Sequence, residues 1–520
     1  EIVKPLQQKI KGKKKENLKQ RAYLNSLTGL IDYGTMQLTG FIVSPFLVNG
    51  LGSSMYGIWQ MLGQMTGYAK VADTRATQVL KWTVAKKKDV ADEDELRSDV
   101  SSALLITLFI VPLILIGGGI IAWYAPYITK AEPEYFNLIR ITCSLLILSL
   151  VVSKLFDLYE SVLRGMNLAF KRMGLRAAIV AIGGGLKVLV ITQGFGLIGL
   201  SIVHVVISLV IGITYYIVVK RTVPWFGLGK TNFKKVINFS KVSGWYLADT
   251  GANVLLSSSD KILLGFVASP VIVTYYTLTL FLPIAIQGLV NRVVLGVIPG
   301  IGKLLGLGEY DRINKALNNI KSITHLLITA SGVTIIIFNS SFLFAWVGEG
   351  YYSGDVANFL IVVMVSQDTF IKHDAYIISA TLDLKRKVFL TLIAGVMFIL
   401  VGFFLTPKLE IAGLCLSLIL GKFLLFIGQR QILLKKIPVN SHSAIRSQDK
   451  LRSIFVSLSL LGIAAYISGY LKIFSILEMT VLAPLSFAMT LLLYLFVGLN
   501  RYSRKELFNI VSSIKVFKSD

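Results

Sequence analysis

Fourteen apolar stretches divide the chain, and the short connections between them are alternately rich and poor in lysine and arginine. The connections and tails on one side carry 40 of these residues, whereas those on the other side carry only Lys130, Lys408 and Lys472. A bilayer core about 30 Å thick needs about 20 apolar residues per helix, and lysine and arginine mark its cytoplasmic side. The pattern therefore predicts an all-α polytopic protein of the cytoplasmic (inner) membrane, with 14 transmembrane helices and both termini in the cytoplasm.

The composition explains the net charge and limits the function classes. The 520 residues are 54% hydrophobic with a formal net charge of +25. Orientation in the membrane and contact with anionic lipid account for that excess, so nucleic acid is not an expected partner. The sequence has no P-loop, nucleophile elbow or metal-ligand spacing, and Cys143 and Cys415 both lie in apolar stretches. We expect a protein that is not an enzyme and has no cofactor or metal.

The predicted transmembrane helices cover about 24–49, 54–80, 100–124, 136–158, 177–193, 197–219, 242–267, 271–299, 323–345, 356–381, 388–405, 411–433, 453–472 and 478–499. The predicted organisation is a basic tail (1–23), an N-terminal six-helix lobe (24–219), an amphipathic linker on the inner membrane surface (220–241), a C-terminal six-helix lobe (242–433), a cytoplasmic loop (434–452), transmembrane helices 13 and 14 (453–499) and a cytoplasmic tail (500–520).

An internal repeat relates the two lobes. Asp32 precedes Asp249 by 217 residues, and Arg75 precedes Arg292 by the same number. Each lobe has six predicted helices and begins in the cytoplasm, so the repeats are parallel and related by a pseudo-two-fold axis along the membrane normal. The two C-terminal helices are an addition to this 6 + 6 plan.

Polar side chains recur at helical spacing on the first helix of each lobe. The stripes consist of Asn25, Thr28, Asp32, Thr35 and Thr39 in the first lobe, and of Asn253 and Ser257 between Asp249 and Asp260 in the second. Such a stripe lines a cavity or joins helices by hydrogen bonds. The carboxylates favour a wet cavity, because a lone carboxylate facing lipid is costly, and they are candidates for ion coupling.

Two Asp–Arg couples follow from the repeat. Asp32 and Arg75 lie at similar predicted depth, as do Asp249 and Arg292, and 43 residues separate the members of each couple. Arginine suits a diphosphate because its planar guanidinium binds phosphate oxygens bidentately and stays charged. The alternative is a structural ion pair that holds neighbouring helices together.

Lysines inside the membrane are further candidates. Lys187 is in the middle of the fifth helix with no carboxylate nearby in sequence, which favours an anionic ligand or an acidic partner on another helix. Lys154 precedes Asp157 by three residues and Asp368 precedes Lys372 by four, so pairing within one helix is the favoured interpretation of both. We expect Lys422 to contact lipid headgroups or the last two helices.

Several short segments resemble the O-antigen and exopolysaccharide repeat-unit (Wzx-type) flippases of the multidrug/oligosaccharidyl-lipid/polysaccharide exporter superfamily. They are Leu51-Gly-Ser-Ser-Met-Tyr-Gly-Ile-Trp59, Ser259-Asp-Lys-Ile-Leu-Leu-Gly265 followed by Tyr275-Tyr276 and Pro299, Trp346-Val-Gly348, and Ile411-Ala-Gly-Leu414. The resemblance implies that undecaprenyl-diphosphate-linked oligosaccharide moves from the inner to the outer leaflet by alternating access. H⁺ or Na⁺ would be the coupling ion, and polysaccharide polymerase machinery would be a partner.

The resemblance also bears on individual residues. Lipid II flippases use arginines on spans two and eight, which fits Arg75 and Arg292, whereas their span-eleven carboxylate for sodium has no counterpart in 388–405. We expect the substrate diphosphate on Arg75, Arg292 and Lys187, with Lys70, Lys154 and Lys372 as further candidates. The alternatives are a cation-coupled multidrug exporter that binds cationic drugs at Asp32 and Asp249, and a non-transporting scaffold for a polysaccharide synthase.

Overall fold

The structure is a computed structural model that describes residues 3–69, 76–88, 91–381, 384–438, 447–470 and 475–516. These residues form helices joined by short connections, and no strand occurs among them. The chain divides into two compact units, residues 1–254 and 255–520. The predicted all-helical, polytopic fold class is confirmed.

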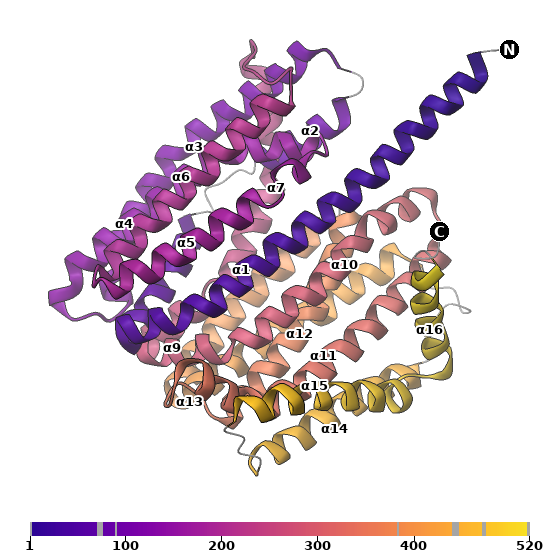
Figure 1. The fold of residues 1–520 in the computed structure, drawn as a ribbon. Coiled ribbons are helices and arrows are strands. Elements are labelled where there is room, and N and C mark those ends of the chain that lie inside the picture. Colours follow the sequence, from indigo (N-terminus) through magenta and orange to yellow (C-terminus); the bar gives the residue numbers. More distant parts are fainter. Residues whose placement is uncertain are drawn as a thin grey trace. The chain divides into compact units, whose positions relative to one another are not determined.

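The first unit is built on α4, which packs against α2, α3 and α6, while α1 packs against α5 (Figure 1). Its elements are α1 (Val3–Ala69), α2 (Ala76–Lys87), α3 (Glu93–Ile128), η2 (Pro133–Tyr135), α4 (Phe136–Gly165), η3 (Ala169–Arg172), α5 (Leu175–Thr192), α6 (Gly196–Thr222) and most of α7 (Phe233–Ser257). A buried core of α2, α3, α4 and α6 side chains, with Leu80, Val100 and Val162 at its centre, joins these helices.

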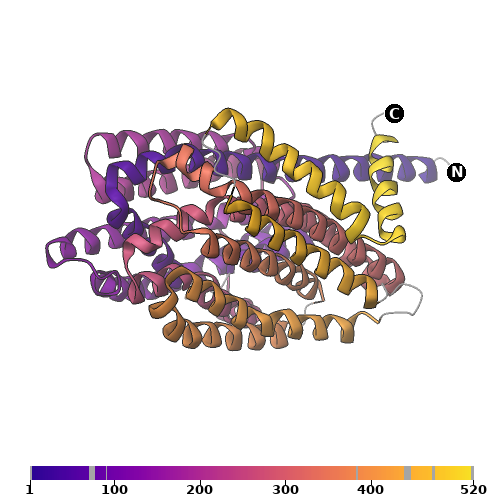
Figure 2. The same cartoon turned by 90° about the horizontal axis from the view of Figure 1, so that it is seen from below.

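In the second unit α12 packs against α10, α11 and α13, and the C-terminal helices α14 and α15 pack on α11 (Figure 2). Its elements are α8 (Asp260–Val267), α9 (Pro270–Thr279), α10 (Phe281–Leu307), α11 (Tyr310–Val347), α12 (Asp355–Ala380), α13 (Leu384–Lys436), α14 (Ser447–Ser468), α15 (Ile476–Leu493), the π-helical turn η4 (Tyr494–Gly498) and α16 (Arg501–Val516). The predicted helices 13 and 14 therefore belong to this unit, where Val333, Val362 and Leu461 share one apolar cluster.

Two long helices each contain a break at a predicted boundary between membrane spans. In α1 the break is at Gly52, with φ 76° and ψ 164°, and in α13 it is at Glu410, with φ 46° and ψ −122°. A positive φ interrupts the helical hydrogen-bond ladder, and glycine adopts it without steric cost. The breaks coincide with the predicted connections after residues 49 and 405.

Ten helices in the described part of the chain are long and apolar enough to cross a membrane. The two broken helices are among them, whereas α7 and α12 are not. The count of 14 spans therefore stays a prediction. The repeat also stays a prediction, although α3 and α11 begin 217 residues apart, at Glu93 and Tyr310, as the sequence offset implies.

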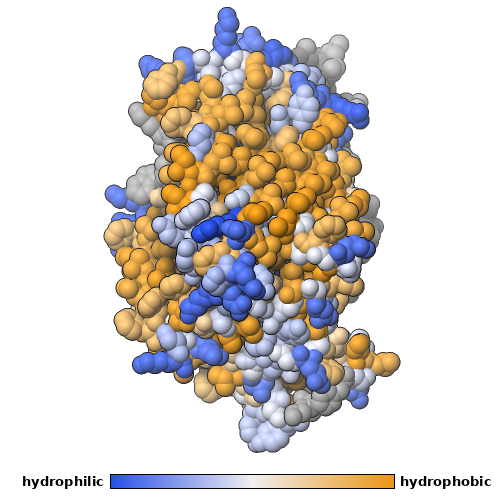
Figure 3. All heavy atoms as spheres, turned by 90° about the vertical axis from the view of Figure 1, so that its left-hand side faces the viewer, coloured by the Kyte–Doolittle hydropathy of each residue, from blue (hydrophilic) through white to orange (hydrophobic). Residues whose placement is uncertain are grey.

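The outer face of α3 shows why these helices need lipid. Phe109, Leu113, Ile116 and Ile120 are exposed, while the opposite face packs into the core of the unit. Their spacing of four, three and four residues places them on one side of the helix. Figure 3 shows large hydrophobic areas on one face, with hydrophilic residues at its upper and lower ends and in clusters between these areas. Large exposed apolar areas of this kind are typical of a membrane-spanning protein.

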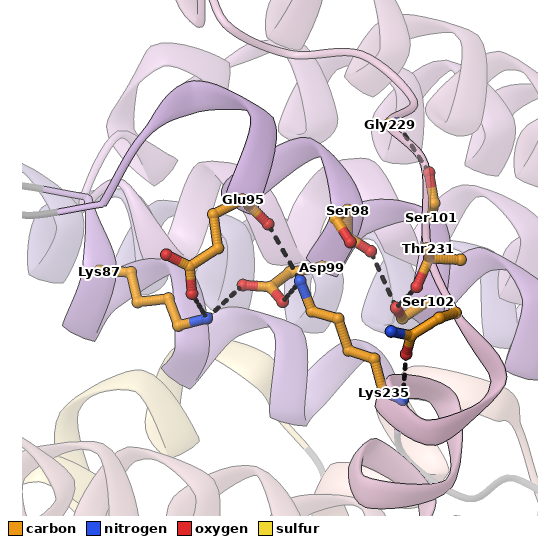
Figure 4. A network of polar contacts seen from close by, with 10 residues as sticks. Lys87, Glu95, Ser98, Asp99, Ser101, Ser102, Gly229, Thr231 and Lys235 are labelled. Carbon is orange, nitrogen blue, oxygen red and sulfur yellow. Dashed lines mark hydrogen bonds and ion pairs between the residues drawn. The ribbon is translucent and has the colours of Figure 1, made fainter.

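The predicted surface linker, 220–241, is mostly helical and docks on α3. α6 continues to Thr222 and α7 begins at Phe233, so only ten residues connect them. Trp225 is buried and its carbonyl accepts a hydrogen bond from Arg97 Nε at 2.9 Å. Further along, the Gly229 amide donates to Ser101 Oγ at 2.9 Å (Figure 4). The connection is thus held against the first unit along its length.

A buried carboxylate completes this docking, and we call the arrangement the Asp99 clasp (Figure 4). Asp99 is fully buried on α3 and forms ion pairs with Lys87 of α2 at 3.0 Å and Lys235 of α7 at 2.7 Å. Lys87 also pairs with Glu95. Burial opposes the charge on Lys87, but its hydrogen bonds to Glu95 and Asp99 outweigh burial and raise the pKa of its ammonium group. The clasp therefore joins three helices through charges of opposite sign.

Candidate anion-binding site

A polar cavity of about 220 Å³ lies between α2 and α4 in the first unit. It is lined by Thr77, Gln78, Lys81, Lys154, Asp157, Glu160, Ser161 and Arg164. Three of these side chains are cationic and two are anionic, so the lining carries one net positive charge. The hydroxyl and amide groups beside the charges are further hydrogen-bond donors for an anion.

Close packing of α2 on α4 creates this grouping. A Cβ at Gly165 would lie 2.8 Å from the Lys81 carbonyl oxygen and 2.8 Å from the Val84 side chain. Only glycine allows the two backbones to approach so closely without a shift. The close approach brings Lys81 to the same cavity as Arg164, the residue before Gly165.

The carboxylates of the cavity are already paired with the two cations of α4. Lys154 Nζ lies 2.9 Å from Asp157 Oδ2, and Arg164 lies 2.7 Å from Glu160 Oε1. The predicted Lys154–Asp157 pair is therefore confirmed. Within the described residues, Lys81 forms no ion pair and no hydrogen bond, and its side chain is half-buried. Its ammonium group is the cation of the cavity that remains available to a ligand.

Arg172 joins the neighbouring helices through ion pairs that include Asp32. The Arg172 guanidinium is buried and lies 2.8 Å from Asp32 Oδ2 and 2.9 Å from Glu160 Oε1. Arg176 adds a second contact to Asp32 at 3.7 Å. The structure thus gives Asp32 ion pairs with η3 and α5, while its predicted couple with Arg75 stays a prediction. Arg75 itself, like Lys70, lies outside the described residues.

The polar stripe of α1 is largely structural. Asn25 Nδ2 donates to Asn167 Oδ1 at 2.5 Å, and its Oδ1 accepts from the Phe170 amide at 2.7 Å, so it fixes the α4–α5 connection. Thr28 is buried and donates to a carbonyl of its own helix. Thr39 packs against Gly184 of α5, where a Cβ would lie 2.3 Å from its methyl group. Thr35 is partly buried. Joining helices, the alternative interpretation, explains Asn25 and Thr39.

The polar residues predicted on the first helix of the second lobe lie on two helices, α7 and α8, and in both compact units. Asp249 is buried on α7, where its carbonyl accepts a hydrogen bond from Asn253 Nδ2 at 2.6 Å. Ser257 is exposed at the end of that helix. Asp260 begins α8 and accepts a hydrogen bond from the Tyr276 hydroxyl at 3.1 Å. Arg292 is exposed on α10. Since Asp249 and Arg292 belong to different units, their predicted couple stays a prediction.

In the second unit the predicted Asp368–Lys372 pair is confirmed and gains a third member. Lys372 Nζ lies 2.7 Å from Asp368 Oδ2, and Lys422 Nζ lies 2.7 Å from Asp368 Oδ1. The expectation that Lys422 contacts headgroups or the last two helices was wrong, because its side chain is buried against α12. The contact could not be predicted from local spacing, because 54 residues separate Asp368 from Lys422.

Lys187 has no acidic partner among the described residues. It lies on α5, partly buried, with His204 of α6 near enough to interact electrostatically. His204 in turn packs against Trp59, with ring centroids 5.5 Å apart. Of the two predicted explanations for Lys187, an acidic partner on another helix finds no support in the described residues, and an anionic ligand remains.

Several residues of the cavity and its surroundings were absent from the sequence prediction. Glu160 and Arg164 are four residues apart, and that spacing was a usable signal for a helical ion pair. Lys81 and Arg172 had no such signal, because no carboxylate lies three or four residues from either in the sequence. Their roles depend on helix contacts that no local pattern encodes.

Comparison with known proteins places the chain in a family. The family model described as polysaccharide biosynthesis protein matches residues 25–305, more than half of the chain. No curated protein sequence matches the chain.

Solved structures share its fold. The inward-closed lipid II flippase MurJ has a TM-score of 0.68 at 12% identity, with 91% of this chain and 98% of that chain covered. An inward-facing multidrug resistance MATE family transporter of the MOP superfamily has a TM-score of 0.57 at 14% identity, with coverages of 80% and 96%. The Vibrio cholerae MATE transporter VcmN in the bent form has a TM-score of 0.54 at 14% identity, with coverages of 81% and 98%. With apolar helices of spanning length, a transporter fold and a matching family model over half its length, the chain is a multi-pass membrane protein that belongs to the polysaccharide biosynthesis protein family.

Proposed function

We propose that the chain is a flippase that moves an undecaprenyl-diphosphate-linked oligosaccharide, such as an O-antigen repeat unit, from the inner to the outer leaflet of the cytoplasmic membrane. The observation that carries the proposal is the cavity between α2 and α4, with its net positive charge and with Lys81, which forms no ion pair in the described part of the chain. The family match and the transporter fold support the same class of substrate.

The chemistry of the cavity fits a phosphate ester. A diphosphate carries negative charge that must leave water when the lipid enters the protein, and burying an uncompensated charge is costly. Lys81 and Arg164 would approach the phosphate oxygens, and Thr77, Gln78 and Ser161 would donate hydrogen bonds. Lys187, which has no acidic partner among the residues that the structure describes, would offer a second positive charge on α5.

The arginines predicted from the repeat extend this proposal. Arg75 directly precedes α2, two residues before Thr77 of the cavity lining, so it is a further candidate ligand of the diphosphate. Arg292 is proposed as its counterpart on α10. We propose that transport follows alternating access and that a proton or sodium gradient drives it. Both termini would lie in the cytoplasm, and a polysaccharide polymerase would be a partner.

The test is flipping of a fluorescent undecaprenyl-diphosphate glycan in proteoliposomes. Lys81→Gln removes the unpaired charge and no ion pair, so the flipping rate should fall about tenfold, the value of one charge-assisted hydrogen bond. Lys86→Gln is the matched control, because Lys86 is exposed on the same helix. Equal rates for wild type and Lys81→Gln would discard the site. Absence of flipping by wild type, with several glycans and with H⁺ or Na⁺ gradients imposed, would discard the function.

The alternative, a cation-coupled multidrug exporter, would bind cationic drugs at Asp32 and Asp249, and the ion pairs of Asp32 count against the first of these sites. A cationic drug would need a free carboxylate, whereas Asp32 is occupied by Arg172 and Arg176. Extrusion of ethidium by wild-type proteoliposomes would support the exporter, and its absence together with glycan flipping would support the flippase.

A further inference from the structure

A cluster on α10, α12 and α13 of the second unit contains two lysines for one carboxylate. Each oxygen of Asp368 lies 2.7 Å from a different ammonium group, those of Lys372 and Lys422. One carboxylate neutralises one of the two charges, so the cluster keeps one net positive charge. That excess lies in a helix of an apolar, multi-pass protein, where a charge requires a compensating partner or water.

Gln287 of α10 fixes the geometry of the cluster. Its Nε2 donates to Asp368 Oδ2 at 3.1 Å and to the Val365 carbonyl at 3.1 Å. Its Oε1 accepts from Lys372 Nζ at 2.8 Å. The Lys372 ammonium is therefore positioned by two acceptors and has one N–H left to donate, since a lysine ammonium has three donors.

The two lysines differ in access. The side chain of Lys422 is 10% exposed, whereas that of Lys372 is 39% exposed. A charged side chain against lipid in a membrane segment is costly, so the exposed part of Lys372 faces water or a ligand. Lys422 thus acts as the buried counter-ion of Asp368, and Lys372 presents the excess charge.

Lys372 occupies nearly the same place in its helix as Lys154 does in the first unit. Lys154 follows the start of α4, Phe136, by 18 residues, and Lys372 follows the start of α12, Asp355, by 17. Each lysine is paired with an aspartate on its own helix. In the predicted repeat α12 corresponds to α4, so both lobes place a paired lysine at one equivalent position.

We propose that Lys372 forms a second phosphate-binding position, located within the second unit and distinct from the cavity between α2 and α4. The inference rests on the proposed function, because it assigns the phosphate ester to the diphosphate of the transported lipid. A phospholipid headgroup offers the same chemistry, so the test must separate the two sources. Lys372 binds the phosphate oxygen through its remaining N–H, while Lys422 keeps Asp368 neutralised.

The experiment measures binding of a fluorescent polyprenyl-diphosphate glycan to protein in nanodiscs, together with the thermal unfolding temperature. Lys372→Gln should lower the affinity about tenfold and leave the unfolding temperature unchanged, because Lys422 still neutralises Asp368. Lys372→Arg keeps a cation and should retain most of the affinity. Lys422→Gln is the matched control and should lower the unfolding temperature, because it removes the buried counter-ion.

Nanodiscs of zwitterionic and of anionic lipid separate the two sources of phosphate. Loss of glycan affinity in zwitterionic nanodiscs supports the transported lipid as the ligand. A variant that equals wild type in zwitterionic nanodiscs and differs only in anionic ones overturns that assignment in favour of a headgroup. Wild-type affinity of Lys372→Gln in both overturns the inference while the proposed function stands. Failure of wild type to bind any diphosphate glycan removes the proposed function itself.

Discussion

Gly165 sets the distance between α2 and α4, and its replacement by alanine should disturb both stability and ligand binding. The new Cβ would lie 2.8 Å from the Lys81 carbonyl oxygen and 2.8 Å from two Val84 side-chain atoms. Because one of these atoms belongs to the backbone, a rotamer change cannot relieve the clash and α2 must move. Overpacking of this kind costs about 1–3 kcal/mol.

The expected result of Gly165→Ala is a lower unfolding temperature and weaker glycan binding. For a unit of about 250 residues each kcal/mol corresponds to about 2–4 °C, so the decrease should be roughly 2–12 °C. Scanning fluorimetry in detergent would measure the decrease, and fluorescence anisotropy with a diphosphate glycan would show whether movement of Lys81 away from α4 lowers the affinity.

Gly117→Ala is the matched control for this prediction. Gly117 is also a helical glycine of the first unit, on α3, but a Cβ there meets nothing within 4 Å. Its replacement should leave the unfolding temperature equal or slightly higher, since alanine favours a helix interior by about 1 kcal/mol over glycine. If Gly165→Ala were as stable as Gly117→Ala and bound the glycan as wild type does, the close approach of α2 and α4 would not be what builds the cavity.

Three further changes test other features of the molecule. Asp99→Ala leaves the two lysines of the Asp99 clasp without their shared carboxylate, so the free energy of unfolding should fall by about 3–5 kcal/mol. Residues 223–232 should then become accessible to limited proteolysis, and an unchanged digestion pattern would contradict the docking. Gly52→Ala forces a side chain into the backbone region at φ 76° and ψ 164°, which should cost about 1–3 kcal/mol in a thermal melt; no loss would contradict the break in α1. The double change Arg75→Glu/Arg292→Glu should abolish flipping in proteoliposomes at wild-type expression; normal transport would remove both arginines from the proposed site.

The sequence predicted those features whose signals are local. Apolar stretches of about 20 residues identify membrane helices because the bilayer demands that length, and the connections between them were predicted where Gly52 and Glu410 break α1 and α13. The pairs Lys154–Asp157 and Asp368–Lys372 were predicted from spacing alone, since side chains three or four residues apart share a helix face.

The cavity could not be predicted, because it depends on which helices touch and how each is rotated. Arg172 reaches Asp32 across 140 residues of sequence, and neither periodicity nor spacing links them. Lys81 meets the charged end of α4 only because Gly165 lets two backbones approach. The predicted couple of Asp32 with Arg75 stays a prediction, because Arg75 lies outside the described residues. It was inferred from similar depth in the membrane and equal spacing in the repeat, and neither criterion indicates the contact with Arg172.

The Asp99 clasp also has a consequence for the order in which the protein is made. Lys87 lies 12 residues before Asp99, whereas Lys235 follows it by 136 residues. At about 5–20 residues per second, the ribosome adds Lys235 roughly 7–27 s after Asp99. During that interval Lys87 is the clasp partner already synthesised, and it has to hold the carboxylate of a newly inserted α3. Once Lys235 has been added, all three residues of the clasp are present, and most of the second unit has not yet been synthesised.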